Sequence, residues 1–385
     1  MMAIRFPLIG LAVLLAASAP ARAAEQLPPG DNLKAVLGEL AAKVKAVCGG
    51  LNPSQSNVAV GEFTGSQDAL RIGVGGGSVM SDLANLLGGF VKADAALELN
   101  GQVFLVDDPN AKGLKAIRIR ANLTDKNGDN VNEFKEFTGF IRNATDFARI
   151  TGATVAFKTD AEYGDKPGDG RRQDAYDALP PKAKEPPAKA TAFVKGSVVR
   201  ATEGSNYDVE ILCGPTAKGP FAAADATLAD KQFPGVPFVE IAQKHYYRVR
   251  VTNHDTARLG VFLHLDGIDQ FTFSEDRAKD GKPKFRLWVV DAGKSITIEG
   301  YHKNVDPGEV FGFLTTKAGE GAASKFPTGL KGAVGTICVG LAREKQPGEK
   351  GSQETVPGDV IPVKQKVVEF KLGDIGEFVT VRYSR

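Results

Sequence analysis

The first part of the chain combines two periodicities of apolar residues. Helices are predicted at 31–47 and 82–90, where apolar residues recur every three or four positions, the second helix with Ser78 or Ser81 as its N-cap. Strands are predicted, from β-type composition between turn residues, at 57–63, 96–106, 114–123 and 131–140. Because helices are mixed with strands and a hairpin, the pattern predicts an α/β module over residues 24–158.

Beyond residue 191 the pattern changes to short segments of period two, without a long helical stretch. Tyr247, Val249 and Val251, for example, place apolar side chains at every second position, which is typical of a strand with one buried face. Strands are predicted at 207–212, 238–242, 246–252, 258–265, 284–290, 295–301, 310–316, 332–342, 366–372 and 377–383. So many short strands indicate an antiparallel sandwich or barrel, and we expect a β-sandwich domain over 191–385. The expected fold class is therefore α+β, multi-domain.

Residues 159–190 differ in composition from both flanking parts. They are rich in Asp, Gly and Lys and contain the pairs Pro180-Pro181 and Pro186-Pro187. Such a stretch buries too little apolar surface to offset the entropy of ordering it, so a flexible linker is predicted here.

The first 23 residues have the three-part plan of a secretory signal. Arg5 precedes an apolar run over residues 8–17, and Ala21-Arg22-Ala23 fits a cleavage site. The run is shorter than the roughly 20 residues that a membrane-spanning helix needs. No cysteine follows to carry a lipid, so we expect an exported protein, periplasmic or extracellular, that does not span a membrane.

Charge disfavours one class of partner. Removal of residues 1–23 removes Arg5 and Arg22, so 46 of the 48 basic residues remain. They balance the 46 acidic residues, and the mature chain is formally neutral. A neutral chain has no global field that attracts a polyanion, so nucleic acid is not expected as a partner.

Three cysteines are too few for a disulfide scaffold. In an oxidising compartment one bridge is plausible, and Cys213 with Cys338 is the preferred pair because both belong to the second domain. The alternative is three separate buried thiols that behave as small apolar side chains.

A glycine-rich stretch with Gly75, Gly76, Gly77 and Ser78 is a candidate ligand-binding site, because backbone N–H groups before a helix can hold an anion. It lacks the third glycine of the dinucleotide fingerprint and the Gly-Lys-Ser/Thr of a Walker motif. The alternative is a surface loop that precedes a capped helix.

Asp125, Asn127, Asp129 and Glu136 have the spacing of calcium ligands, with Glu136 at the twelfth position of such a loop. Asn130 occupies the position where a glycine normally makes the turn. The competing interpretation is a plain hairpin turn, for which Asn-Gly between two strands is a strong signal.

All four histidines lie in the second domain, at His245, His254, His264 and His302, without the spacing of a metal site. His264 alternates with the apolar residues of its strand and is expected to face solvent. No Gly-x-Ser-x-Gly motif occurs, and Cys338 lies within an apolar pattern. We therefore expect a protein that is not an enzyme and needs no cofactor. The alternative is an envelope hydrolase that uses His264 or His302 with a nearby acid.

Two family resemblances accompany these patterns. The first half resembles the domain of LpoB-type penicillin-binding-protein activators and curli-secretion lipoproteins. The resemblance rests on residues 58–65, the helix after them and the strand pair around Asn127-Gly128. The second half, with residues 247–253, 265–267 and 292–298, is similar to a β domain of uncharacterised secreted bacterial proteins. The first resemblance implies a non-catalytic domain for envelope assembly or partner activation, although the lipid-bearing cysteine is missing. The expected function is a secreted or periplasmic binding or assembly protein that recognises a protein or envelope component.

Overall fold

The structure, a computed structural model, describes most of the chain after the predicted signal. The described residues are 32–50, 57–65, 75–92, 94–179, 192–230, 235–279, 281–306, 308–317, 320–321, 335–345 and 368–383.

The N-terminal domain is a four-stranded sheet with helices on one face. Its strands follow the order β1-β2-β3-β4, with β1 parallel to β2 and the other two pairs antiparallel. The elements are α1 (Leu33–Gly50), β1 (Val58–Gly65), α2 (Gly75–Leu87), η2 (Gly88–Phe90), β2 (Leu97–Asp107), β3 (Lys115–Asp125), β4 (Phe137–Ile141) and α3 (Ala144–Thr151).

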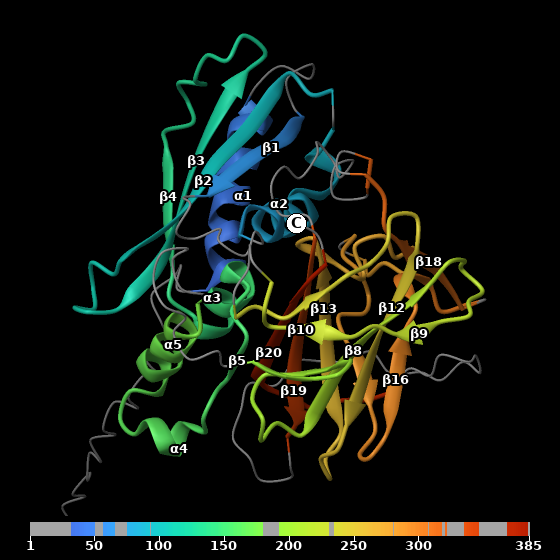
Figure 1. Cartoon of the computed structure of the whole chain (residues 1–385). Helices are drawn as coiled ribbons and strands as arrows, with labels where there is room; N and C mark the ends of the chain where they lie inside the picture. The colour runs from blue at the N-terminus through green and yellow to red at the C-terminus, as the bar shows by residue number, and fades with distance from the viewer. Residues whose placement is uncertain are drawn as a thin grey trace, which may run out of the picture.

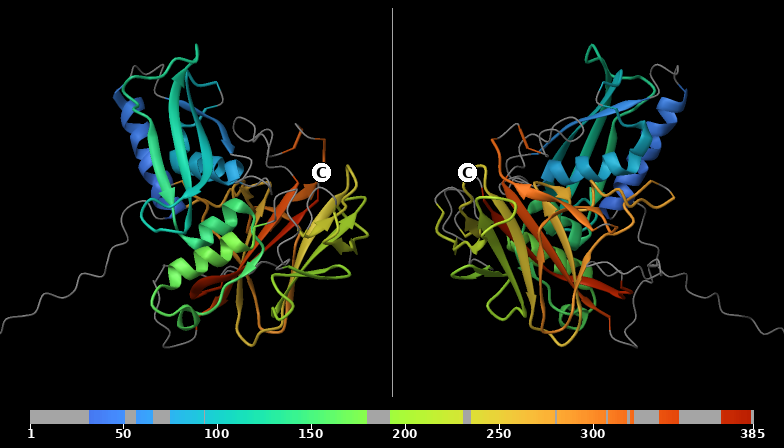
Figure 2. Two further views of the ribbon diagram at one scale, coloured as in Figure 1. Left: turned by 60° about the vertical axis from the view of Figure 1, so that its left-hand side comes forward. Right: turned by 90° about the vertical axis from the view of Figure 1, so that its right-hand side faces the viewer.

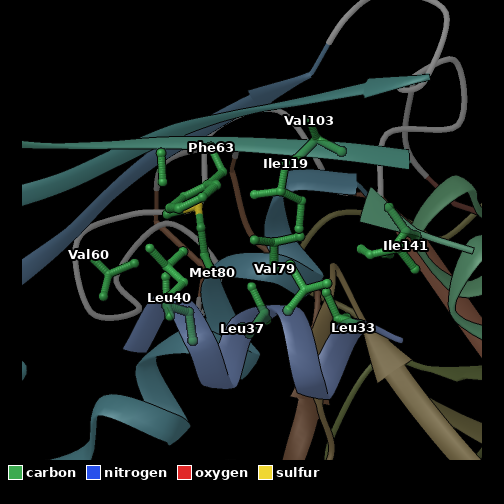
Figure 3. Close-up of a cluster of buried hydrophobic side chains, with 14 of the residues drawn as sticks. Leu33, Leu37, Leu40, Val60, Phe63, Val79, Met80, Val103, Ile119 and Ile141 are labelled. Atoms are coloured by element: carbon green, nitrogen blue, oxygen red, sulfur yellow. The ribbon is translucent and has the colours of Figure 1, made fainter. Parts of the chain in front are cut away.

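The core of this domain lies between α1, α2 and the sheet (Figure 3). Its labelled side chains are Leu33, Leu37 and Leu40 of α1, Val79 and Met80 of α2, and Val60, Phe63, Val103, Ile119 and Ile141 of the strands. Each such side chain stabilises the fold by roughly 1.5–3 kcal/mol when it is fully buried. Both helices lie on the same side of the sheet (Figure 2). On the other side Glu98, Gln102, Phe104, Arg118 and Phe140 are partly or fully exposed, whereas Ala59 and Ala116 are buried.

The second domain is a sandwich of two sheets (Figure 1). The inner sheet, which faces the N-terminal domain, has the order β10 (Ala226–Thr227), β11 (Phe238–Val239), β20 (Leu372–Arg382), β19 (Thr336–Glu344), β13 (Leu259–Leu265) and β14 (Ile268–Asp269), with β15 (Trp288–Val290) and β5 (Val155–Ala156) beside it. The distal sheet has the order β17 (Gly300–Asn304), β18 (Glu309–Leu314), β12 (Tyr246–Asn253), β8 (Tyr207–Gly214), β7 (Val198–Arg200) and β6 (Phe193–Lys195), with β16 (Ser295–Ile298) and β9 (Ala222–Ala223).

Alternating apolar residues of the two sheets form the sandwich core. Val249 and Val251 of β12 are fully buried, as are Leu263 of β13 and Val339 of β19. The period of two that predicted these strands therefore marks their buried faces. The predicted class, an α+β multi-domain fold with an α/β module followed by an antiparallel sandwich, is confirmed.

The two domains share a continuous contact. The core of the N-terminal domain includes Ile268, Cys338 and Phe378 of the inner sheet. In addition β5, which follows α3, pairs antiparallel with β20, so the N-terminal part of the chain adds a strand to the sandwich. The second face of the inner sheet is thus covered by the N-terminal domain.

The predicted flexible linker over residues 159–190 is wrong for its first half. Residues 160–163 form α4 (Asp160–Tyr163) and residues 167–177 form α5 (Pro167–Asp177). Arg172 of α5 is only 2% exposed, and its guanidinium donates to the buried Asp108 carboxylate at 2.7 Å. An ion pair, which composition does not indicate, holds this polar segment in place. Residues 180–191 lie outside the described residues.

Several predicted strands are shorter than expected. In the predicted strand 131–140, only the end forms a strand, β4, and in the predicted strand 284–290 only the end forms β15. Of the predicted strand 366–372, the described residues 368–371 lie outside β20. No helix in the described part of the chain combines the length and apolar character required to cross a bilayer.

Candidate functional site

A short helix missed by the sequence analysis, α3, positions the main polar contact between the domains. Its N-cap Asn143 accepts a hydrogen bond from Asp146 N at 3.0 Å, and it ends at Gly152 in a left-handed conformation with φ of 68°. These two residues, an N-cap before the apolar Phe147 and a C-terminal glycine, were the signal that could have predicted it.

Five polar side chains meet at the domain boundary, and we call them the interdomain cluster: Asp82 of α2, Asp146 and Arg149 of α3, His264 of β13 and Asp269 of β14. Arg149 Nη2 lies 2.8 Å from Asp82 Oδ2 and 3.5 Å from Asp146 Oδ1, while Nη1 lies 3.1 Å from His264 Nε2. His264 Nε2 is 3.7 Å from Asp269 Oδ2. Arg149 therefore joins two carboxylates of its own domain to a histidine of the other.

Burial sets the protonation of this cluster. Desolvation, assisted by the charge of Asp82, raises the pKa of Asp269 to about 7, and burial also raises the pKa of Asp146. Desolvation together with the positive charge of Arg149 lowers the pKa of His264 to about 3. His264 is then neutral, and because a guanidinium can only donate, its Nε2 accepts from Arg149 and its proton resides on Nδ1.

The expectation that His264 faces solvent is wrong. The side chain does point away from the sandwich core, but that face is covered by the N-terminal domain and His264 is 6% exposed. Strand periodicity assigns the face of a residue, whereas a neighbouring domain decides whether that face meets water.

His302 has a serine and a carboxylate beside it. Its Nδ1 lies 3.0 Å from Ser274 Oγ and its Nε2 lies 3.9 Å from Asp276 Oδ2. Ser274 and His302 are 2% and 1% exposed, with the Phe271 and Trp288 rings against the imidazole. Ser274 Oγ also accepts a hydrogen bond from Asp276 N, so these groups brace a turn in a closed environment.

The glycine-rich candidate does not form the predicted loop. Gly75, Gly76, Gly77 and Ser78 all belong to α2, which begins at Gly75. Ser81 is fully buried inside the same helix and cannot be its N-cap. Residues 66–74 lie outside the described residues.

The calcium candidates are not brought together. Asp125 Oδ1 accepts hydrogen bonds from the backbone N of Asn127 and Asp129, which closes a hairpin turn. Glu136 is instead held by Arg120 through two hydrogen bonds of 2.9 and 2.6 Å. Arg120 lies five residues before Asp125 on β3, about 16 Å away at 3.3 Å per residue. Among the described residues, no group of three or more His, Cys, Asp or Glu side chains could hold a metal ion.

The predicted bridge between Cys213 and Cys338 is absent, since both are free thiols. Cys213 of β8 packs at the sandwich core, whereas Cys338 of β19 packs against the N-terminal domain. The two side chains therefore lie in different cores. Cys48 is a third buried free thiol.

The uncovered face of the four-stranded sheet carries a row of three large side chains, which we call the arginine row. Phe104 of β2 pairs with Arg118 of β3, and Arg118 pairs with Phe140 of β4. Directly paired residues point to the same face, so Phe104 and Phe140 lie on the two strands beside Arg118. The Phe140 ring is contacted by the guanidinium of Arg142, whose Cζ lies 5.2 Å from its centroid. Arg118 Cζ lies 4.9 Å from the centroid of the Phe104 ring. All three side chains are partly exposed.

Arg118 differs from the neighbouring arginines in its partners. Arg120 is bound by Glu136, and Arg142 Nε donates to both oxygens of Asp108 at 3.0 Å. Arg118 Nε is buried without a hydrogen-bond acceptor among the described residues. The sequence analysis predicted both flanking strands but did not single out Arg118, because only strand register reveals the row.

No family model, no curated protein and no solved structure matches this chain.

Proposed function

We propose that this chain is an exported binding or assembly protein without catalytic activity, periplasmic or extracellular, that recognises a protein or envelope component through the uncovered face of its four-stranded sheet. The arginine row is the observation that carries this proposal. It presents an arginine, a residue enriched at binding hot spots, and two phenylalanines, which are enriched at interfaces, on a sheet.

The histidines support a binding role over catalysis. His264 and His302 are both nearly inaccessible, and each contacts groups that stabilise the fold. His254 is exposed, and its Nε2 lies 2.8 Å from Asp208, whose carboxylate also accepts from Arg200 at 2.5 Å. A general base needs access to its substrate, and the buried positions of His264 and His302 do not provide it.

Site-specific cross-linking tests the proposal. A photoreactive amino acid at Gln102, an exposed outer-face position beside the arginine row, should give discrete cross-linked products in the native envelope. The same group at Thr297, exposed on β16 of the distal sheet, is the matched control. Equal labelling from both positions, or none from Gln102, would contradict the proposal.

A second candidate, an envelope hydrolase, is favoured by the side-by-side placement of Ser274, His302 and Asp276. It predicts that a fluorophosphonate probe labels the folded protein and that Ser274→Ala abolishes the labelling. Because Ser274 is 2% exposed, we expect no labelling of the folded wild-type chain.

A further inference from the structure

We infer that the arginine row binds a carboxylate on an acidic, partly apolar segment of a partner protein. This inference rests on the proposed function, since it names the chemistry that the uncovered sheet face would recognise. The row supplies one guanidinium for the acid and a phenylalanine on each neighbouring strand for apolar neighbours.

The charge at the row is incompletely neutralised. The adjacent arginines Arg120 and Arg142 are satisfied by Glu136 and Asp108. Glu98, a carboxylate on the same face of β2, lies six residues before Phe104, about 20 Å away at 3.3 Å per residue. Glu136, which is hydrogen-bonded to Arg120, also interacts with the charge of Arg118, so two arginines share one carboxylate. A net positive charge is therefore left at the row for an external anion.

The distal sheet of the sandwich shows that a charged sheet face in this protein can be fully paired. On its outer face Arg248 lies 3.0 Å from Glu299, Arg250 Nε lies 2.8 Å from Glu210, and Arg200 contacts Asp208. Each of these three arginines therefore has a carboxylate partner within the fold. The charge of Arg118 acts on Glu136, but that carboxylate is hydrogen-bonded to Arg120, and the buried Nε of Arg118 has no acceptor among the described residues.

The geometry of the row suits a carboxylate better than a lone apolar group. The contact of Arg118 with the Phe104 ring restricts the guanidinium, so less side-chain entropy is lost when it forms two parallel hydrogen bonds. Neighbouring strands are about 4.8 Å apart, so the backbones of Phe104 and Phe140 lie about one strand spacing to either side of Arg118. An acidic residue between apolar residues of one polypeptide matches this arrangement.

Fluorescence anisotropy with defined peptides tests the inference on the full mature chain. The probe is a fluorescein-labelled peptide of repeated Leu-Ser-Glu-Ser, compared with the same peptide carrying Gln in place of Glu. We expect the Glu peptide to bind at least tenfold more tightly, with an affinity that falls as salt rises. Arg118→Gln should remove this preference, and Arg118→Lys should retain only part of it.

Lys126→Gln, an exposed lysine in the hairpin turn after β3, is the matched control and should change the affinity less than twofold. Unfolding midpoints of all variants identify any loss of fold. Equal affinity of the two peptides for the wild-type chain, or no binding of the Glu peptide, would overturn the carboxylate assignment. Cross-linking from Gln102 would still stand in that case, so the two proposals fail separately. Binding of inorganic phosphate in place of the Glu peptide would also overturn it.

Discussion

At the scale of single residues, His264 and Asp269 form a pair whose protons are redistributed by folding. In the folded protein Asp269 keeps its proton up to a pKa of about 7, and His264 stays neutral down to a pKa of about 3. In the unfolded chain, an aspartate ionises near pH 3.9 and a histidine near 6.5. Between about pH 4 and 6.5, both states therefore bind one proton on this pair, and the pair adds no pH dependence to stability.

Removing one member should expose the pH dependence of the other. With Asp269→Asn, only the unfolded state takes up a proton on His264, so the free energy of unfolding should rise with pH between about 4 and 6.5. With His264→Asn, only the folded state holds a proton on Asp269, so the free energy of unfolding should fall as the pH rises to about 7. Each slope should differ from that of the wild type by up to about 1.4 kcal/mol per pH unit.

Urea unfolding at several pH values between 4.5 and 6.5 measures these slopes. If the free energy of unfolding of both variants changed with pH as it does in the wild type, the pair would not exchange its protons on folding.

The three cysteines give a second prediction at this scale. Because Cys213 and Cys338 lie in different cores and Cys48 is buried in α1, thiol titration of the denatured, non-reduced protein should count three thiols per chain. In the folded state these thiols should react slowly, since burial raises the pKa of Cys213 and Cys338 to about 11. A count of one thiol would instead reveal the bridge.

At the scale of elements, α5 shows how a polar segment becomes ordered. Asp108 accepts hydrogen bonds from Asn110 N, Arg142 and Arg172. Burial by itself would raise the pKa of Asp108, but these donors lower it overall, so the carboxylate stays ionised. An ionised carboxylate between two arginines ties α5 to the loop after β2 and to the residue after β4.

Breaking this network should release α5. Arg172→Ala leaves Asp108 buried with one fewer donor, and loss of one partner of a buried ion pair typically costs about 3–5 kcal/mol. Hydrogen exchange should then accelerate over residues 167–177 with little change in α1. Gln173→Ala, on the same helix, removes a hydrogen bond to the exposed Asp177 and is the control. Unchanged protection of α5 in Arg172→Ala would refute the role of the ion pair.

At the scale of the whole molecule, Arg149 connects the two domains. Its guanidinium forms ion pairs with Asp82 and Asp146 and donates a hydrogen bond to His264 across the boundary. Apolar contacts through Ile268, together with the pairing of β5 with β20, extend the same interface. The domains should therefore unfold as one unit in the wild-type chain.

Arg149→Ala should uncouple the domains. It leaves the partly buried carboxylates of Asp82 and Asp146 without their counter-charge, a loss of up to about 3–5 kcal/mol, and should split one unfolding transition into two. Arg149→Lys keeps the charge and should be milder. Arg250→Ala removes a partly exposed pair on the distal sheet and should cost about 1 kcal/mol or less. Calorimetry that shows a single, unshifted transition for Arg149→Ala would contradict this prediction.

Local patterns were sufficient for the elements whose apolar residues repeat regularly. The helix α1 and the strands β8, β12 and β13 lie within a few residues of the predicted positions, because their periodicity reflects one buried face. The helices α3 and α5 were missed, because the first is short and the second is polar and is held by Arg172. Neither site was predictable, since the interdomain cluster and the arginine row depend on which residues are brought together across elements.

By itself, the sequence determined the division into a mixed α/β part and an antiparallel part, because apolar period is a local property of the chain. Tertiary structure alone decided that the outward face of β13 is buried, so that His264 meets Arg149 rather than water. It also decided the register that places Phe104, Arg118 and Phe140 in one row. Burial and register depend on distant segments, and composition or spacing along the chain does not encode them residue by residue.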